Sequence, residues 1–397
     1  MIDLTKKRLL IYPFFGSLYF LEGIVYGLAT VIIPIYFIDR GIDLSITTII
    51  VGVISIPWVL KFIFGGIVDY FNLFGRKRFI IIGEILSATS LIIISTIDPK
   101  TALIPFTVII VLASTGVAFL DVSADAWAIQ LSTEKNRGKL NAAMYGGQFL
   151  GMAFCTSVIG NIAGMVGYDI AFICSAFFII IIIIFPFIIK EEITIKTRQK
   201  IKKVLIQEFK NNTTKLIAFF GLLSSVSFGL LGVVIPIYMK TVLNLEIGQI
   251  GIFVSIGPLS TLVGNVLGGV LTDKYGRKKS LFLFLGLNLI FSTGLIFATS
   301  WQKLIILWSI IGFLHGGHYT VISAMFMDIT NPKIGAAQYS ILSSLTNVGE
   351  MGGTSFSGAL ITTLGFSRVF LYSGWMYGPL LLILYFINLK SYIKKYS

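Results

Sequence analysis

Apolar runs of about 20 residues recur along the whole chain, separated by short polar connectors. A transmembrane helix needs about that length to cross the hydrocarbon core of a bilayer, whereas a membrane β-strand needs only about ten residues of alternating polarity. Charged residues make up only 12% of the chain, which is about half the roughly 25% found in soluble proteins. The sequence therefore predicts an all-α membrane protein.

The runs define twelve predicted membrane spans. They cover residues 9–38, 47–68, 79–97, 102–131, 140–164, 168–189, 215–239, 247–271, 280–300, 302–328, 334–363 and 367–389. With the N-terminus in the cytoplasm, all but six of the 31 lysines and arginines fall in cytoplasmic connectors. The exceptions are Lys61, inside a span, and Arg40, Lys100, Lys240, Lys303 and Arg368, in outer connectors. Because basic connectors stay in the cytoplasm, this asymmetry predicts a multi-pass protein of the cell (plasma) membrane with both termini cytoplasmic.

A net charge of +13 would also suit a nucleic-acid-binding protein. The basic residues, however, lie in the short connectors and do not form a basic, aromatic-rich soluble face. We therefore expect a lipid bilayer, and no nucleic acid, as the partner. Cys155 and Cys174 lie inside apolar runs and are expected to be small buried residues, not a disulfide.

The two halves of the chain repeat each other. YGLATVIIPIY (26–36) and FGLLGVVIPIY (228–238) match at seven of eleven positions. Each segment is followed by a second span that ends in G-x-x-x-D and then G-R-K. The repeated residues are Gly65, Asp69, Gly75, Arg76 and Lys77 in the first half and Gly269, Asp273, Gly276, Arg277 and Lys278 in the second. The repeat predicts six spans within 1–189, a polar linker over 190–214, and six spans within 215–397.

The paired G-x-x-x-D and G-R-K loops resemble the loop signature of the major facilitator superfamily. The resemblance covers the whole chain. It implies two pseudo-symmetric six-helix bundles around a central cavity, which opens to each side of the membrane in turn. It also implies a gating role for the loops, through charge pairs or helix caps that break when one side opens. The other interpretation is that these residues only orient the spans.

A narrower resemblance rests on four segments. They are the first loop, DYFNLFGRKR (69–78), together with PWVLKFIFGGIVD (57–69), DVSADAW (121–127) and AAQYSILSSLTNVG (336–349). These segments are similar to the branch that contains muropeptide permeases and acetyl-CoA transporters, and this similarity implies proton-driven uptake of a polar solute. Span 5 lacks G-P-x-x-G-G and span 4 lacks an Arg, which weighs against drug export.

Three charged residues are expected about 8–10 Å inside the membrane, at 1.5 Å per residue from the cytoplasmic end of their spans. They are Lys61, Glu84 and Asp125. A charge at such a depth needs a partner, water or neutralisation. We therefore predict a buried ion-pair network in which Lys61 pairs with Asp125, Glu84 or both. The alternative for Asp125 is a titrating role.

Three acids are expected near the midplane, about 15 Å deep, with no basic residue at their level. They are Glu22, Asp121 and Glu350. Burial without a cation favours the neutral form of a carboxyl group, so these acids are candidates for proton coupling or substrate contact. The alternative is a permanently neutral, hydrogen-bonded acid. Asp121 is thus predicted to carry the proton and Asp125, four residues later, to pair with Lys61.

His318, in LHGGHYTV of span 10, falls opposite Asp121 when the halves are aligned. It is predicted to join the coupling or substrate site, or else to be a neutral packing residue. H-x-x-H without a nearby carboxylate or Cys does not predict a metal site. Uncharged candidates for lining the cavity are Tyr26, Gln148, Gln338, Tyr339 and Asn347; each is alternatively a hydrogen-bonding contact between helices.

The function expected from these features is secondary active transport of a small polar solute, by proton-coupled symport, with a peptide, sugar-peptide or sugar as substrate. A strongly anionic solute is disfavoured by the buried acids. The alternatives are a proton-independent uniporter, a drug or metabolite exporter, and, more remotely, a non-transporting sensor. The sequence contains no nucleophile elbow, zinc-binding helix or phosphate-binding loop, so we expect no enzyme and no cofactor. We expect a monomer.

Overall fold

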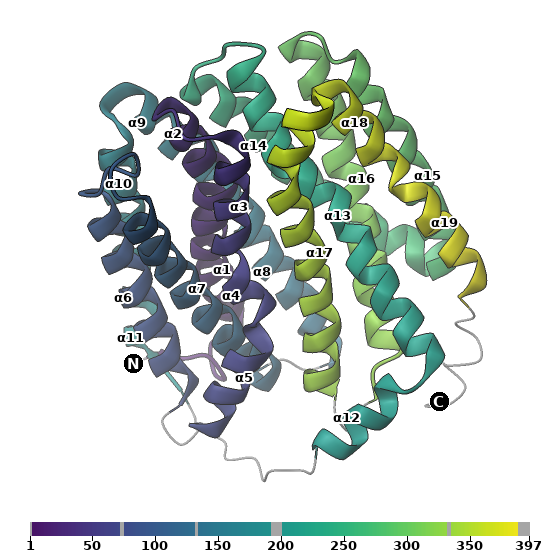
Figure 1. The fold of residues 1–397 in the computed structure, drawn as a ribbon. Coiled ribbons are helices and arrows are strands. Elements are labelled where there is room, and N and C mark those ends of the chain that lie inside the picture. Colours follow the sequence, from purple (N-terminus) through teal and green to yellow (C-terminus); the bar gives the residue numbers. More distant parts are fainter. Residues whose placement is uncertain (1, 72–74, 132–133, 192–200, 332–334, 388–397) are drawn as a thin grey trace. The chain divides into compact units, whose positions relative to one another are not determined.

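The computed structural model of the chain describes residues 2–71, 75–131, 134–191, 201–331 and 335–387, and most of them are helical (Figure 1). Residues 192–200 of the predicted linker lie outside the described part. The remainder of that linker contains α12 (Ile201–Phe209). The one sheet described has two strands, β1 (Ile2–Asp3) and β2 (Ile189–Lys190), which pair in parallel. The all-α prediction is confirmed apart from this short pairing.

The first half contains six spans, several of them divided into consecutive helices. They are α1 (Ile11–Gly27) with a π-helical turn (Leu28–Ile32) and α2 (Ile33–Asp39); α3 (Leu44–Ile54), α4 (Ile56–Val59) and α5 (Lys61–Tyr70); α6 (Arg76–Ile94); α7 (Leu103–Leu131); α8 (Glu134–Phe154) with a π-helical turn (Cys155–Ile159) and α9 (Gly160–Val166); and α10 (Tyr168–Ile182) with α11 (Ile184–Ile188). Together they give the six helical spans that the sequence predicts for this half.

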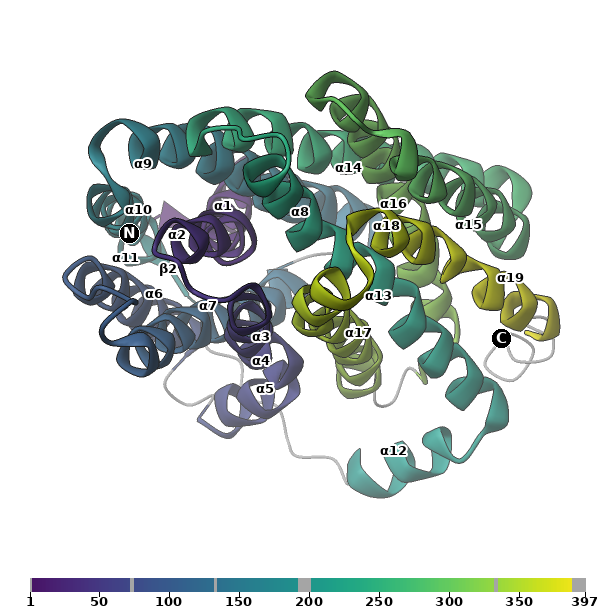
Figure 2. The ribbon, with the colours of Figure 1, turned by 45° about the horizontal axis from the view of Figure 1, so that its top comes forward.

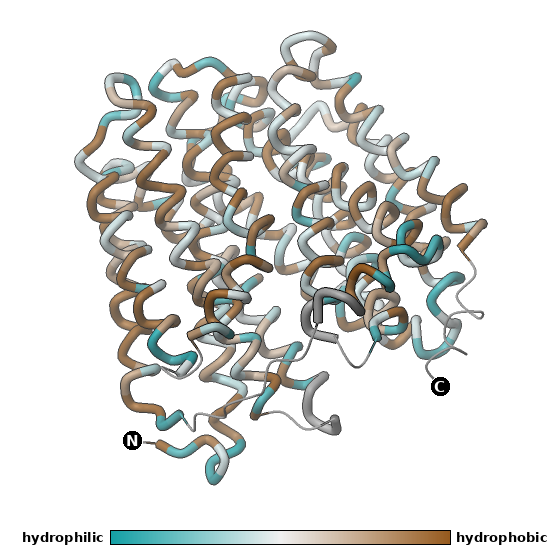
Figure 3. The backbone as a smooth tube through the Cα atoms, turned by 60° about the horizontal axis from the view of Figure 1, so that its bottom comes forward, coloured by the Kyte–Doolittle hydropathy of each residue, from teal (hydrophilic) through white to brown (hydrophobic). Residues whose placement is uncertain are grey.

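The second half repeats this order. Its helices are α13 (Asn212–Thr241); α14 (Ile247–Tyr275); α15 (Arg277–Gly294) with a 3₁₀ turn (Leu295–Phe297); α16 (Trp301–Asp328); α17 (Gly335–Leu364); and α18 (Phe366–Trp375) with α19 (Tyr377–Phe386). Ten of the twelve spans are long and apolar enough to cross a membrane by length and composition alone. The other two are α6 and α17, the spans that carry Glu84 and Glu350. Figure 3 shows apolar residues along most of the helices.

Proline explains where the second span divides. Pro57 lies in the first turn of α4, where its missing N–H breaks the hydrogen-bond ladder of a continuous helix. The chain then begins a new helix at Lys61. At the start of the same span, the carboxylate of Asp43 caps α3 by accepting from the amides of Ser45, at 2.8 Å, and Ile46, at 3.2 Å. A second division, at Leu60, separates α4 from α5 and leaves Lys61 as the first residue of α5.

The chain packs as two compact units. Unit 1 contains Met1–Ile195 and Ile235–Leu259, and unit 2 contains Lys196–Val234 and Ser260–Ser397. The C-terminal end of α13 belongs to unit 1, where Lys240 Nζ forms an ion pair with Asp39 Oδ1, at 2.8 Å.

In unit 1, α1 packs along α8 and α6 packs along α7 (Figure 2). Gly147 and Gly151 of α8 allow the close approach to α1. A Cβ atom at either position would lie 2.0 Å from a backbone oxygen of α1, that of Gly16 or Phe20, so only glycine fits there. This contact brings Gln148 of α8 against the face of α1 that carries Glu22.

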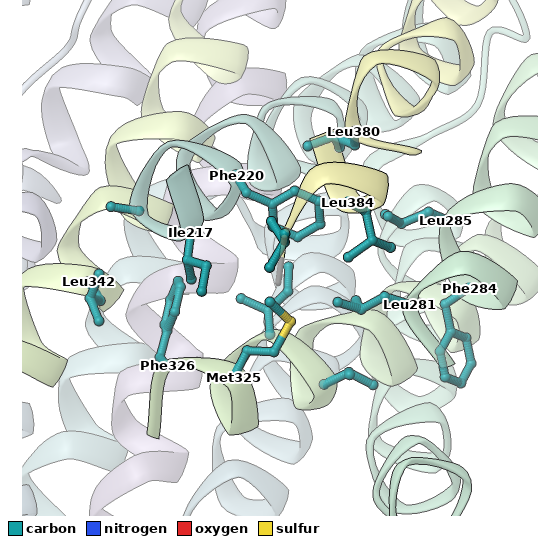
Figure 4. Close-up of a cluster of buried hydrophobic side chains, with 14 of the residues drawn as sticks. Ile217, Phe220, Leu281, Phe284, Leu285, Met325, Phe326, Leu342, Leu380 and Leu384 are labelled. Carbon is teal, nitrogen blue, oxygen red and sulfur yellow. The ribbon is translucent and has the colours of Figure 1, made fainter. Parts of the chain in front are cut away.

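In unit 2, a core of apolar side chains joins α13, α15, α16 and α19 (Figure 4). It contains Ile217 and Phe220 of α13, Leu281, Phe284 and Leu285 of α15, Met325 and Phe326 of α16, and Leu380 and Leu384 of α19. The core fixes the rotation of α16, the helix that bears both histidines of the chain.

Candidate functional site

A cluster of buried charged and aromatic side chains lies inside unit 1. The Nζ atom of Lys61 lies 3.6 Å from Oδ2 of Asp121, and only 5% of the Asp121 side chain is exposed. The prediction that Asp121 has no cation at its level is therefore wrong, whereas the predicted pairing of Lys61 with Asp125 stays a prediction. Counting residues along a span gives the depth of the backbone. The four-carbon side chain of lysine can place its ammonium about one helical turn away from that depth.

Tyr19 of α1 connects the two acids of α7. Its hydroxyl oxygen lies 3.0 Å from Oδ1 of Asp121 and 2.5 Å from Oδ1 of Asp125. The two carboxyls, four residues apart, therefore share one face of α7. Tyr19 itself was not predicted, although it lies three residues before Glu22, on the same side of a helix.

Glu22 of α1 receives two hydrogen bonds on a single oxygen. Gln148 Nε2 donates to Oε1 at 2.9 Å, and the indole Nε1 of Trp58 donates to the same atom at 3.3 Å. No described residue hydrogen-bonds Oε2. Trp58 also meets the ring of Tyr26 edge-on, at 6.3 Å. Gln148 was a predicted cavity residue, whereas Trp58 was missed; its position three residues before Lys61 was the available signal.

Glu84 lies apart from this cluster. Its side chain is 1% exposed, and neither carboxyl oxygen has a partner among the described residues. Nearby on α6, the hydroxyl of Ser87 donates to the carbonyl oxygen of Ala113 on α7, at 2.7 Å. The prediction that Glu84 pairs with Lys61 is therefore wrong, because equal depth in the membrane does not place two side chains on facing sides of their helices.

Unit 2 contains the remaining acid and both histidines. His315 and His318 are 7% and 1% exposed, and Glu350 is half-buried. At Gly229 of α13, an added Cβ would lie 2.7 Å from Cα of Glu350. The neighbouring residue, Phe228, stacks on His315 with ring centroids 3.5 Å apart. One turn of α13 thus lies against both the His315 ring and the backbone of α17 at Glu350.

The uncharged candidates in the second half separate into two groups. Gln338 is fully buried and holds the chain between α16 and α17: its Oε1 accepts from the amide of Asn331 at 2.9 Å and its Nε2 donates to the carbonyl of Ile329 at 3.2 Å. It is therefore a structural residue in this fold. Tyr339 and Asn347 are half-buried on α17 and stay candidates.

The first G-R-K loop holds together elements of its own unit. The Arg76 guanidinium donates to Gln130 at the end of α7. Lys77 Nζ donates to the carbonyl of Ile189, just after α11, at 2.9 Å. The backbone amides of Arg76 and Lys77 donate to the carboxylate of Glu191, at 2.7 and 2.9 Å. Gly75 precedes them with φ of 78°, a conformation that favours glycine.

The second G-R-K loop repeats the arrangement in unit 2. Arg277 Nε lies 3.0 Å from Oδ2 of Asp328 at the end of α16, and its Nη1 lies 3.8 Å from Asp273. Lys278 Nζ donates to the carbonyl oxygens of Tyr385 and Ile387, at 2.7 and 3.2 Å. In both halves the arginine therefore binds the end of the fourth span and the lysine caps the end of the sixth. Every partner named here belongs to the same unit as its loop.

Among the described residues, no group of three or more His, Cys, Asp or Glu side chains comes together. The site that the geometry brings together is the cluster of Tyr19, Glu22, Lys61, Asp121 and Asp125, with Trp58 and Gln148 around Glu22. Such a buried set of acids with one amine can hold a proton and release it, or bind the polar groups of a solute.

Comparison with known proteins supports a transport protein. The chain is 26% identical over 406 residues to a putative transporter, AmpG 4, of Rickettsia conorii, in an alignment that covers 94% of this chain and 96% of the relative. It is 23% identical to the anhydromuropeptide permease of Escherichia coli, over 89% of this chain and 75% of that protein.

Solved structures show the same fold. A mutant of the nucleoside transporter NupG matches with a TM-score of 0.77 at 14% identity, covering 95% of this chain and 99% of that one. A D-xylose-proton symporter matches with a TM-score of 0.73 at 17% identity, covering 95% and 97%. The family model of the Major Facilitator Superfamily matches residues 15–221 and 217–395. The chain is therefore a multi-pass membrane protein with the twelve-helix transporter fold, and it belongs to the Major Facilitator Superfamily.

Proposed function

We propose that this protein is a proton-coupled symporter that carries a small polar solute of the peptide, sugar-peptide or sugar class by alternating access. The observation that carries the proposal is the position of the Tyr19 hydroxyl within hydrogen-bond distance of both Asp121 and Asp125. A tyrosine hydroxyl has one hydrogen and can donate to only one of two acceptors. Both contacts are satisfied only when one of the two carboxyl groups carries a proton.

We infer from the ion pair which carboxyl group that is. Asp121 forms an ion pair with the ammonium of Lys61. The proton then belongs to Asp125, which donates to the Tyr19 oxygen while Tyr19 donates to Asp121. This proposal assigns the proton to Asp125, where the sequence alone favoured Asp121. Asp121 becomes the charged end of a short hydrogen-bonded chain.

Charge balance supports a second proton site. Glu22, Asp121 and Asp125 face one amine, that of Lys61, so complete ionisation would leave two uncompensated negative charges in the low-dielectric interior. Glu22 keeps one oxygen without a described partner, and a proton can bind there without breaking the hydrogen bonds on the other. Glu22 and Asp125 are thus the two carboxyl groups suited to take up and release protons.

The proposed substrate class follows from the relatives and from the charge of the cluster. The Escherichia coli relative is an anhydromuropeptide permease, and muropeptides are sugar-peptides. An excess of buried acids suits a solute with hydroxyl, amide or amino groups and disfavours a strongly anionic one. We propose a sugar-peptide, or one of its sugar or peptide parts, as the solute.

The G-R-K loops support alternating access in a way that differs from charge pairs across the bundles. Their arginines and lysines bind the ends of the fourth and sixth spans of their own unit. We propose that they keep the span ends of each unit together while the units move, as rigid-body rocking requires. In this proposal the loops affect gating only indirectly, by keeping the helices of each unit packed together.

A flux assay in proteoliposomes tests the function. We expect a disaccharide-tripeptide to accumulate when the outside is acidic, and Asp125→Asn and Tyr19→Phe to abolish accumulation while counterflow of labelled solute persists. Saturable uptake that does not depend on the pH gradient would indicate a uniporter instead. Drug efflux without uptake of any peptide or sugar would show an exporter, and no flux of any solute would indicate a sensor.

A further inference from the structure

The imidazoles of His315 and His318 present polar atoms that no described protein group satisfies. They are Nδ1 of His315 and both ring nitrogens of His318. Each of these side chains is more than nine-tenths buried. A buried donor or acceptor without a partner is destabilising, so a chain rarely keeps three of them in one place without a use for them.

The spacing of the histidines in H-G-G-H places both imidazole rings on the same side of α16. Residues three apart share a helical face, and the glycines between them turn toward other helices. A Cβ on Gly316 would lie 2.1 Å from the carbonyl of Thr261 on α14, and one on Gly317 would lie 2.3 Å from the ring of Phe284 on α15. The backbone of α16 is therefore fixed against two neighbours, and the imidazoles extend from the remaining surface.

Aromatic side chains lie against both imidazole rings. Phe228 stacks on His315 with an interplanar angle of 2°, and the Tyr319 ring lies 6.1 Å away. Tyr377 meets His318 edge-on at 6.3 Å. The two imidazoles are 5.6 Å apart and nearly perpendicular, and no hydrogen bond joins them, because neither nitrogen of His318 has a partner among the described residues.

An imidazolium ion would be costly in these surroundings, because none of the described ion pairs involves either ring. A neutral imidazole has one donor and one acceptor. A hydroxyl or a primary or secondary amide also offers one or more of each. A carboxylate or phosphate offers only acceptors, and an ammonium only donors. The pair is therefore chemically matched to an uncharged hydrogen-bonding group.

We propose that His315 and His318 form a neutral subsite in unit 2 that binds a hydroxyl or amide group of the transported solute. The proposal rests on the proposed transport function, since alternating access is what would open the rings to a solute. It assigns the uncharged part of the solute to unit 2 and leaves proton binding to the acids of unit 1.

The chain contains only these two histidines, which makes a spectroscopic test direct. The full-length protein, purified without a polyhistidine tag and labelled with ¹⁵N in the imidazole rings, gives NMR signals from these two residues alone. The probes are a disaccharide-tripeptide and, separately, its disaccharide and its tripeptide. We expect at least one ring nitrogen to shift on binding while both rings remain neutral; the disaccharide arm reports hydroxyl recognition and the tripeptide arm reports amide recognition.

Variants give a second measurement. His318→Gln retains a donor and an acceptor and is expected to keep KM within about threefold, whereas His318→Met is expected to raise KM about tenfold with little change in kcat. Three results would overturn the proposal: no ring shift with any probe, conversion of a ring to imidazolium on binding, or an unchanged KM in His318→Met together with a raised Tm, as a packing role requires. Each of these can occur while pH-driven uptake and its dependence on Asp125 persist, so failure of the subsite is distinguishable from failure of the transport function.

Discussion

Gln148 Nε2 lies 2.9 Å from Oε1 of Glu22, and this hydrogen bond joins α8 to α1 at the buried polar cluster of unit 1. The indole N–H of Trp58 donates to the same oxygen. Two donors on one carboxyl oxygen stabilise the ionised form. Gln148 and Trp58 are thus expected to act as positioning residues, through Glu22.

Removing these donors should move the pH profile of uptake. In Gln148→Leu, the ionised form of Glu22 loses one stabilising hydrogen bond, so protonation becomes easier and half-maximal uptake moves to higher pH, by about one unit. Trp58→Phe should move half-maximal uptake in the same direction by a smaller amount, because the hydrogen bond from Trp58 to Glu22 is longer than the one from Gln148. The measurement is initial uptake between about pH 5 and 8 in proteoliposomes. Gln148→Glu adds a second acid and serves as the contrasting variant; an unmoved profile in both Gln148→Leu and Trp58→Phe contradicts the assigned role.

The Lys61–Asp121 ion pair should show strong coupling in a double-mutant cycle. Lys61→Met leaves Asp121 as a buried charge without its ion-pair cation, which we expect to cost about 3 kcal/mol of unfolding free energy. Asp121→Asn should cost a similar amount, and the double variant should regain most of the loss. Unfolding in detergent, followed by tryptophan fluorescence, measures the cycle. Additive losses would show that the two side chains do not interact.

Close packing of α1 on α8 should make Gly151 intolerant of any side chain. The added methyl of Gly151→Ala would lie 2.0 Å from the carbonyl oxygen of Phe20, so the helices must separate, and we expect a Tm loss of several degrees and a lower yield of folded protein. Gly286→Ala on α15 is the matched control, because an added Cβ there meets nothing within 4 Å. It should be neutral or slightly stabilising. Equal effects at the two positions would exclude the close contact as the cause.

Lys278 should stabilise unit 2 through the end of α19. Lys278→Met removes the donor to the carbonyls of Tyr385 and Ile387, and we expect about 1 kcal/mol of lost stability and faster proteolysis near the C-terminus. Lys274→Met, at an exposed position on α14, is the control. A Lys278→Met protein that keeps its stability but no longer transports would favour a direct gating role for this loop.

The amino-acid sequence was sufficient to predict the fold. Runs of about 20 apolar residues have one stable solution in a bilayer, the helix, because every backbone polar group must be satisfied within the segment. The repeated G-x-x-x-D and G-R-K loops then indicated the superfamily that the family model matches. The acids and the amine of the site were also found from sequence, since charges are rare and costly in such runs.

The pairing of those charges followed only from the packing of the helices. Counting residues along a span gives depth, but the partner of a side chain depends on the rotation of its helix and on the reach of the side chain. Lys61 therefore meets Asp121, and Glu84, at a similar depth, lies apart from the cluster. Tyr19 and Trp58 carry no charge and are ordinary residues of a membrane span by composition. Their importance comes from packing that brings α1 and α4 against α7 and α8, which come much later in the chain.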